Sequence, residues 1–233
     1  MSERRDQIEA GLAAVQDRIE RACADSGRSS AEITLVVVTK FFPPSDVRLL
    51  AELGVRHVGE NRHQEAVEKA AECADLGLDW HFIGSLQSNK AAAVAGYSTV
   101  VESVDRAKLV GGLSRGADEH GKELDCLVQV SLDPPDASGR SGAAIDQVPA
   151  LAERILEAES LRLRGVMGVA PLGGDARVAF ARLAEVAAVV RLMEPQATWI
   201  SAGMSGDLEE AIKEGATHLR IGSAVLGPRP VVK

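Results

Sequence analysis

Eight short apolar runs alternate along this chain with stretches of helical periodicity, and this alternation constrains the fold more than any other feature. The runs are rich in β-branched residues and are expected to be strands: Ile33–Lys40, Val55–Gly59, Trp80–Gly84, Thr99–Ser103, Leu124–Leu132, Leu163–Gly168, Ala197–Ser201 and His218–Gly222. Strands joined by crossover helices lie parallel in one sheet. Eight such repeats in 233 residues predict a closed (β/α)8 TIM barrel rather than an open doubly wound sheet.

The stretches between these runs are expected to be helices that cover the barrel: Ser45–Leu53, Asn61–Cys73, Asn89–Ala95, Asp105–His120, Ile145–Glu157, Ala176–Met193 and Asp207–Lys213. An extra helix over Ser2–Ser26 precedes the first strand, because Ile8, Leu12, Val15 and Ile19 repeat at helical spacing. No segment resembles a hinge, so residues 1–233 are expected to form a single domain. The least regular stretch, Asp133–Gly142, follows the fifth strand and is therefore expected at the functional rim.

Charge and composition exclude several classes of function. The net charge of −8 disfavours nucleic acid or an anionic membrane as the main partner. The three cysteines, Cys23, Cys73 and Cys126, are widely spaced and form neither a metal motif nor a disulfide framework. No window is apolar enough to cross a membrane, and no heptad or extra apolar stripe indicates an oligomer. We expect a monomeric cytoplasmic protein.

Lys40 ends the first predicted strand, just before two prolines at Pro43 and Pro44. Strand alternation places Val36, Val38 and Lys40 on one face. An ammonium on a core-facing surface is costly unless it is compensated, and a lysine partly removed from water can form a Schiff base with a carbonyl. Alternatively, Lys40 is a strand-end lysine whose amine reaches solvent, and this segment alone favours that interpretation.

Glycine and serine follow the last two predicted strands, as Gly203-Met204-Ser205 and Gly222-Ser223. The corresponding loops commonly form the phosphate site of such barrels. Helix capping by Ser205 or Asp207 explains either loop alone equally well, but two such loops on neighbouring strands favour anion binding. Arg220 lies on the face that carries Gly222 and needs an acceptor, which is either a structural salt bridge or a ring nitrogen or acid group of a ligand.

Other polar residues near the predicted rim have plain structural interpretations. His81 is placed to line the barrel mouth, although a satisfied core histidine is favoured. Glu60 and Glu65 are interpreted as acids at a helix N-terminus rather than as a carboxylate pair. Lys90 is interpreted as a helix-start lysine rather than as a second acceptor for the ligand.

A lysine at the end of strand one, phosphate donors after strands seven and eight and an arginine on strand eight together suggest pyridoxal phosphate. Over nearly its whole length the chain resembles the pyridoxal phosphate homeostasis proteins, the alanine racemase-like family that has only the N-terminal barrel. The segments that carry the resemblance are Val38–Lys40, Gly59–Asn61 with Gln64-Glu65, Trp80–Gly84 with Leu86–Lys90, Leu163–Met167, Gly203–Ser205 with Asp207, and Leu219–Gly222. The chain departs from the family pattern at Arg62-His63, at Ser85 and at Arg140, where the family has Tyr-Val, Pro and Lys.

The resemblance implies a fold type III barrel without the β-rich C-terminal domain of the racemases. It implies that Lys40 forms an internal aldimine with pyridoxal 5′-phosphate and that Arg220 faces the pyridine nitrogen. The phosphate is then surrounded by Ser201, Gly203, Met204, Ser205, Gly222 and Ser223. Asn61 lies near the ring, and His81 completes the expected cofactor-binding set. No metal ligand and no catalytic residue is expected.

The implied function is vitamin B6 and amino-acid homeostasis, in which the chain holds pyridoxal phosphate and delivers it transiently to apoenzymes. An arginine beside the ring nitrogen does not readily release a proton, so the ring is a weak electron sink. The single tyrosine, Tyr97, precedes strand four and is far from the expected place of a catalytic acid or base. The alternatives are an amino-acid racemase of low activity and a Schiff-base lyase that acts on phosphorylated substrates.

Overall fold

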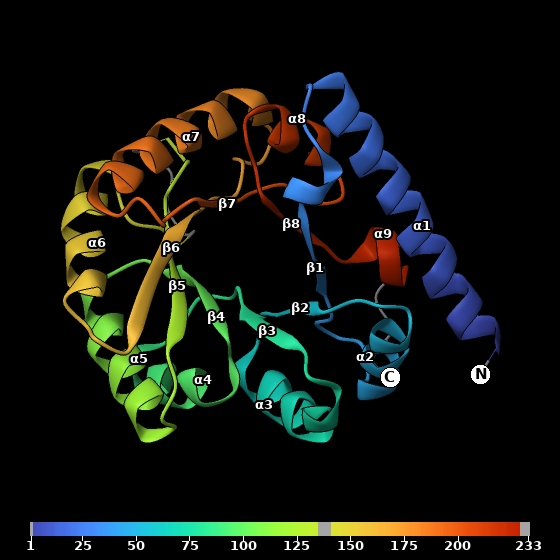
Figure 1. The fold of residues 1–233 in the computed structure, drawn as a ribbon, viewed down its shortest axis with the longest axis horizontal. Coiled ribbons are helices and arrows are strands. Elements are labelled where there is room, and N and C mark those ends of the chain that lie inside the picture. Colours follow the sequence, from blue (N-terminus) through green and yellow to red (C-terminus); the bar gives the residue numbers. More distant parts are fainter. Residues whose placement is uncertain (1, 135–140, 229–233) are drawn as a thin grey trace.

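A computed structural model describes residues 2–134 and 141–228, and its centre is a closed barrel of parallel strands (Figure 1). The strands are β1 (Thr34–Val38), β2 (His57–Glu60), β3 (Asp79–Phe82), β4 (Val100–Val104), β5 (Leu124–Gln129), β6 (Leu161–Met167), β7 (Trp199–Ser201) and β8 (His218–Ile221). Each strand pairs with the next, and β1 pairs with β8, with Thr34 opposite His218. The predicted eight-stranded barrel is confirmed.

Helices surround the barrel between successive strands (Figure 1). They are α1 (Ser2–Asp25), α2 (Pro44–Glu52), α3 (His63–Glu72), α4 (Ala91–Tyr97), α5 (Ala107–Glu119), α6 (Val148–Leu156), α7 (Ala176–Met193), α8 (Leu208–Lys213) and α9 (Ser223–Leu226). Single 3₁₀ turns lie at Ser30–Glu32, Ala74–Leu76, Ser88–Lys90 and Ile145–Gln147. Within the described part of the chain, none of these helices has the length and hydropathy that a membrane crossing needs.

The extra helix α1 lies along the outside of the barrel, beside α8 and α9 (Figure 1). Gly11 permits this close packing, because a Cβ atom at that position would lie 2.4 Å from the carbonyl oxygen of Val225. The Arg18 guanidinium donates to both carboxylate oxygens of Glu209, at 2.7 and 2.8 Å, and to the carbonyl oxygen of Ser205 at 3.0 Å. The N-terminal helix therefore fixes the loop that follows β7.

Several strands end earlier than the sequence predicts. The first strand ends at Val38 rather than at Lys40, since its ladder with β2 stops at the pair Val38–Gly59. The chain then turns, with the Phe42 N–H donating to the carbonyl oxygen of Thr39 at 3.0 Å. Likewise β5 ends at Gln129 instead of Leu132, because the chain leaves the β6 ladder there.

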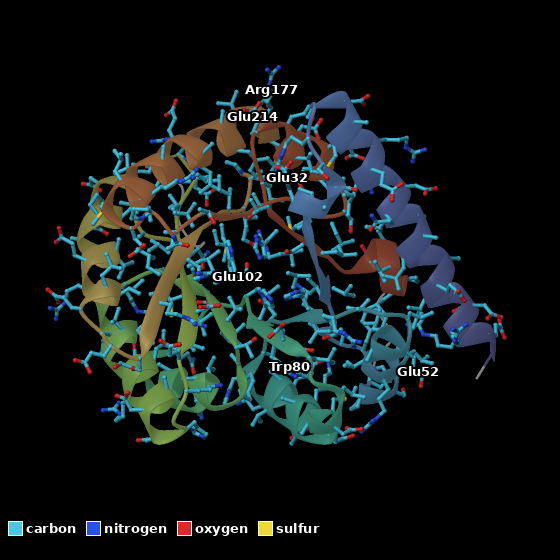
Figure 2. All side chains as sticks on the ribbon, in the orientation of Figure 1. Glu32, Glu52, Trp80, Glu102, Arg177 and Glu214 are labelled. Carbon is cyan, nitrogen blue, oxygen red and sulfur yellow. The ribbon has the colours of Figure 1, made fainter. Side chains whose placement is uncertain are left out.

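The inside of the barrel holds a group of buried polar side chains beside an apolar cluster of Val100, Leu127 and Met167, whereas the layer between barrel and helices is apolar. Buried side chains inside include His81, Glu102, Ser201, His218 and Arg220. Figure 2 shows Glu102 near the centre of the ring of strands, while Trp80, on the opposite face of β3 from His81, lies toward α3. A polar barrel interior requires that each charge finds a partner, because unpaired charges are costly to bury.

His218 is one of these interior residues, and its imidazole ring is neutral in the folded protein at neutral pH. Its ring lies 4.4 Å from the Trp199 ring, measured between centroids, and its Nδ1 atom is 2.9 Å from the Thr217 hydroxyl. Burial lowers the pKa of His218 from 6.5 to about 3. The folded protein therefore keeps His218 neutral at pH values where the unfolded chain binds a proton.

We predict that this histidine destabilises the protein in acid. Stability from a neutral buried histidine is present above pH 6.5 and is lost as the pH falls toward 3, because only the unfolded chain gains the proton. Between pH 6.5 and pH 5 the wild-type unfolding free energy should fall by about 1–2 kcal/mol more than that of His218→Gln. Urea unfolding at both pH values measures this difference. Equal losses in the two proteins would contradict it.

Candidate functional site

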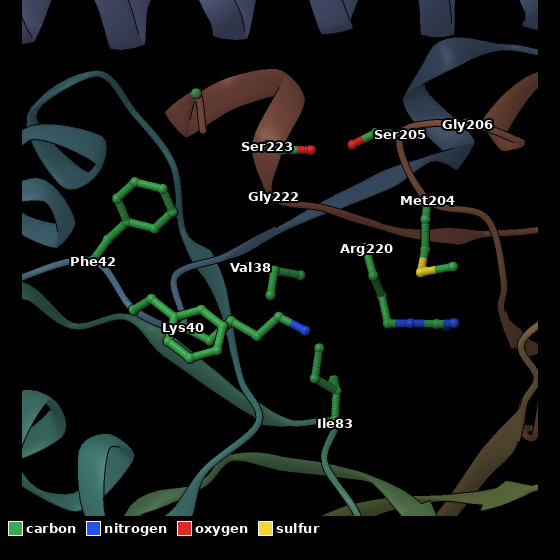
Figure 3. Close-up of a pocket in the computed structure, with 12 residues that line it drawn as sticks. Val38, Lys40, Phe42, Ile83, Met204, Ser205, Gly206, Arg220, Gly222 and Ser223 are labelled. Atoms are coloured by element: carbon green, nitrogen blue, oxygen red, sulfur yellow. The ribbon is translucent and has the colours of Figure 1, made fainter. Parts of the chain in front are cut away.

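A cavity of about 310 Å³ opens at the carboxyl ends of the barrel strands, and we call it the Lys40 pocket (Figure 3). Its walls come from the ends of β1 and β8, the start of α9 and the turns and loops after β1, β3, β7 and β8. The twelve described residues that line it are Val38, Lys40, Phe41, Phe42, Ile83, Met204, Ser205, Gly206, Arg220, Gly222, Ser223 and Gly227. Residues far apart in the sequence therefore converge on one space.

Lys40 lies in the turn after β1, not on the strand as predicted. Figure 3 shows its amine directed into the pocket, toward Arg220. Phe41 follows with a φ of 72°, which is unusual for a bulky residue and strains the backbone. Such a conformation persists only where surrounding contacts hold it.

Lys69 of α3 provides those contacts from behind the turn. Its side chain is 5% exposed, and its Nζ donates to the carbonyl oxygen of Thr39 at 2.7 Å. The same Nζ donates to Oε1 of Glu60 at 2.7 Å and to Oε1 of Glu65 at 2.6 Å. The Thr39 hydroxyl also donates to Oε1 of Glu60, at 2.6 Å. We call Lys69, Glu60 and Glu65 the Lys69 cluster.

The Lys69 cluster forms hydrogen bonds with the backbone on both sides of Lys40. The carbonyl of Thr39 accepts from Lys69, and the N–H of Phe41 donates to Oε1 of Glu65 at 2.5 Å. The residues before and after Lys40 are thus bonded to the same buried group of charges. This arrangement fixes the direction in which the Lys40 side chain leaves the turn.

The interpretation of Glu60 as a helix-terminal acid was wrong. It is the last residue of β2 and 1% exposed, and it shares Lys69 with Glu65, which lies in the first turn of α3. Burial raises the pKa of Glu60, while the charge of Lys69 opposes that rise. The four-residue spacing from Glu65 to Lys69 could have predicted an ion pair within the helix. Only the fold shows that the end of β2, with Glu60, lies beside that pair.

The loops after β7 and β8 bring two hydroxyls to the far side of the pocket from Lys40. Figure 3 shows the Ser205 and Ser223 side chains pointing toward each other. Asp207 does not cap α8 with its side chain. Instead its Oδ1 accepts from the N–H of Met204 at 2.6 Å, which closes the loop. Gly203 has a φ of 91°, and a Cβ atom there would meet Ala211 at 2.6 Å, so this corner requires glycine.

Arg220 is buried in β8, and one edge of its guanidinium is fixed. Nη1 donates to the Ser201 hydroxyl at 2.6 Å, and Nη2 donates to the carbonyl oxygen of Gly168 at 2.8 Å. The carboxylate of Glu102 lies 3.8 Å from Nη1. Burial lowers the pKa of Arg220, and the charge of Glu102 opposes that effect. Arg220 therefore has the buried counter-ion of a structural salt bridge, and it also lines the pocket.

The structure brings together six of the expected cofactor-binding residues and leaves four outside the pocket lining. Those in the lining are Lys40, Met204, Ser205, Arg220, Gly222 and Ser223. Ser201 lies behind Arg220, and Gly203 shapes the loop that carries Ser205.

The two remaining expected residues lie in different places. Asn61 lines a neighbouring cavity that shares Ile83 with the Lys40 pocket. His81 lies inside the barrel, with its Nδ1 atom 2.7 Å from Oε1 of Glu102, as expected for a satisfied core histidine. Lys90 lines a third cavity, next to Asn61 and His63.

Sequence reasoning placed Val38 on the face of Lys40 but missed the rest of the apolar lining of the pocket, which includes Phe41, Phe42 and Ile83. These residues carry no polar signal, and only the turn after β1 brings the two phenylalanines to the mouth. Residues 135–140 of the predicted rim loop, including Arg140, lie outside the described residues. On either side of them, Asp133 and Ser141 line the cavity that also contains Asn61.

A family model, a curated relative and a solved structure all relate this chain to one family of proteins. The family model "Alanine racemase, N-terminal domain" matches residues 12–230. The pyridoxal phosphate homeostasis protein of Mycobacterium tuberculosis is 42% identical over 97% of this chain and 95% of its own length. The structure of PipY from Synechococcus elongatus with PLP bound has a TM-score of 0.79 at 33% identity, covering 94% of this chain and all of PipY.

A more distant match concerns the fold alone. An alanine racemase from Clostridium difficile superimposes with a TM-score of 0.72 at 13% identity. The match covers 97% of this chain and 60% of the racemase.

We predict that Lys69→Met destabilises the protein by about 3–5 kcal/mol, since removing one partner leaves the Glu60 carboxylate buried without a cation. A matched control is Lys108→Met, at an exposed position of α5, where a change below about 0.5 kcal/mol is expected. Urea unfolding of the three proteins at pH 7 measures both effects. Similar stabilities of the two variants would show that the cluster does not hold the turn.

Proposed function

We infer that this chain, which belongs to the family of pyridoxal phosphate homeostasis proteins, holds pyridoxal 5′-phosphate in the Lys40 pocket. One observation carries the inference: an amine from the turn after β1, a hydroxyl from the loop after β7, a guanidinium from β8 and a hydroxyl from the first residue of α9 converge on one cavity of about 310 Å³. The cavity is within the size range of small-molecule sites. The related PipY has been seen with PLP bound, and it covers 94% of this chain.

The lining residues fit each part of the cofactor. The Ser205 and Ser223 hydroxyls can donate to phosphate oxygens, and the adjoining Gly206 and Gly222 leave room for them. Apolar side chains of Val38, Ile83 and Met204 offer contact surface for an aromatic ring (Figure 3). Arg220 offers N–H donors to a ring nitrogen, which in its neutral state is an acceptor.

Lys40 is the residue that would attach the cofactor covalently, as a Schiff base. Its amine nitrogen would bond to the aldehyde carbon, and the aldehyde oxygen would leave as water. The amine must therefore be delivered in a defined direction. Hydrogen bonds on both neighbours, from Lys69 to Thr39 and from Phe41 to Glu65, supply that constraint.

Bound pyridoxal phosphate supplies an aldehyde that condenses with amines and a ring that withdraws electrons most strongly when its nitrogen is protonated. Arg220 does not supply that proton, because a guanidinium stays charged in proteins. Glu102, 3.8 Å away, favours the charged form of Arg220. The residues of this pocket thus suit retention of the cofactor better than the stabilisation of a carbanion.

The pocket also offers few groups that could move protons. Among its twelve described lining residues, only Lys40 and Arg220 have ionisable side chains. Tyr97 lines a different cavity and stacks on His63 with ring centroids 5.9 Å apart. Burial raises the pKa of Tyr97, which keeps its phenol protonated at neutral pH.

We therefore favour a carrier over a racemase or a Schiff-base lyase. As a carrier in vitamin B6 homeostasis, the chain would act as a monomer in the cytoplasm and would pass pyridoxal phosphate to apoenzymes that need it. Support comes from the relatives, which carry the homeostasis name at 37–42% identity along nearly their whole length.

We predict that wild-type protein mixed with pyridoxal phosphate gains an absorbance band distinct from that of the free cofactor, because attachment to the amine changes the conjugated system. Lys40→Ala should lack the band, whereas Lys90→Ala should keep it, since Lys90 lines a separate cavity. Absorbance titration at pH 7 measures all three. A wild-type protein without the band, or a band that persists in Lys40→Ala, would refute covalent attachment at this lysine.

A further inference from the structure

A buried carboxylate, that of Glu102 of β4, lies at the centre of the barrel interior (Figure 2). Its Oε1 lies 2.7 Å from Nδ1 of His81, and its Oε2 accepts from the Ser201 hydroxyl at 2.5 Å. Burial alone would raise the pKa of Glu102, but the hydrogen bond and charge of His81 and the charge of Arg220 outweigh burial and lower it to about 2. Glu102 is therefore an anion at neutral pH.

The charge of Glu102 fixes the direction of the bonds that lead to Arg220. An ionised carboxylate only accepts, so the Ser201 hydroxyl must donate its proton to Oε2. The Ser201 oxygen is then left to accept from Nη1 of Arg220, which lies 2.6 Å away. Glu102, Ser201 and Arg220 form a chain in which every donor points toward the carboxylate.

The other side of Glu102 is held by a histidine pair. Nδ1 of His81 donates to the carboxylate, and the Nε2 atom of the same ring lies 3.1 Å from Nδ1 of His57. The carboxylate is thus held in place from behind by His81 and His57, and it cannot turn away from Ser201 without breaking those bonds.

The result is an arginine whose orientation is set from outside the pocket. Two of its N–H groups are used by Ser201 and by the carbonyl oxygen of Gly168. Because the guanidinium is planar, these two bonds also fix the direction of its remaining N–H groups. Arg220 itself still lines the pocket. None of the groups that hold it, namely Glu102, Ser201 and Gly168, is among the residues that line the pocket.

We propose that Glu102 is a positioning residue that acts through Ser201 to aim Arg220 at the ring nitrogen of the bound cofactor. Glu102 touches no ligand. It makes Arg220 selective for a ring that offers an acceptor at this place. The identity of the ligand rests on the proposed function, whereas the orientation of Arg220 does not.

The test compares two ligands in two proteins. Dissociation constants are measured by absorbance for pyridoxal phosphate and for its 1-deaza analogue, in which a C–H group replaces the ring nitrogen. For pyridoxal phosphate, Glu102→Gln should weaken binding by about 10- to 100-fold, the effect of misplacing one hydrogen bond to a charged group. For the analogue, the same substitution should change affinity less than about threefold, because the contact is already missing. Equal losses for both ligands, or no loss, would overturn the proposal.

A second measurement needs no cofactor. Phenylglyoxal modifies accessible guanidinium groups, and peptide mass analysis gives the rate at Arg220 alone. The ligand-free Glu102→Gln protein should react at Arg220 about tenfold faster than wild type, since the chain that restrains the group is broken. An unchanged rate would reject the proposal whatever the ligand is. If wild type bound no pyridoxal phosphate, the proposed function would fail and this rate would still decide the role of Glu102.

Variants of Ser201 provide an independent test of the proposal if Glu102→Gln does not fold. Ser201→Ala removes the link but leaves Glu102 and Arg220 as a charge pair, while Ser201→Thr restores a hydroxyl. The alanine variant should weaken binding of pyridoxal phosphate by about tenfold. The threonine variant should recover most of that loss and should react with phenylglyoxal at the wild-type rate. Equal behaviour of the two variants would contradict a role for the hydroxyl.

Discussion

The buried ammonium of Lys69 is the interaction on which the site depends. It joins the end of β2, the first turn of α3 and the turn after β1, through Glu60, Glu65 and the carbonyl of Thr39. The barrel alone would only bring Lys40 to the functional end. The cluster also holds the strained turn in which Phe41 has a φ of 72°, and so determines where the Lys40 amine points.

Residues on the opposite wall of the pocket are also held by charged groups that lie outside it. Arg220 is held by Ser201 and Glu102, and the loop that carries Ser205 is held from outside by Arg18 of α1. In each case a residue that lines the pocket is fixed by a charged group that does not line it. Such outer contacts pre-organise a binding site, because less conformational freedom is lost when the ligand arrives.

Much of this could be predicted from the sequence, for physical reasons that differ between residues. Alternating apolar runs and helices define a barrel, and a barrel places Lys40, Ser205, Arg220 and Ser223 at one end. Alternation gives the face of a strand but not the depth along it, so His81 was placed in the binding set although it lies inside the barrel. The end of β1 at Val38 depends on the turn that Lys69 stabilises from another element, and no local pattern reveals such a contact.

The central claim is that these constraints retain a cofactor rather than drive a reaction with it. The described lining of the pocket contains Lys40 and Arg220 as its only ionisable groups, and a racemase needs acid and base groups on both sides of the substrate α-carbon. The most direct measurement is deuterium incorporation at the α-carbon of alanine in D₂O, with the protein and pyridoxal phosphate present. Our account predicts no exchange above that of Lys40→Ala. Exchange that depends on Lys40 would contradict it.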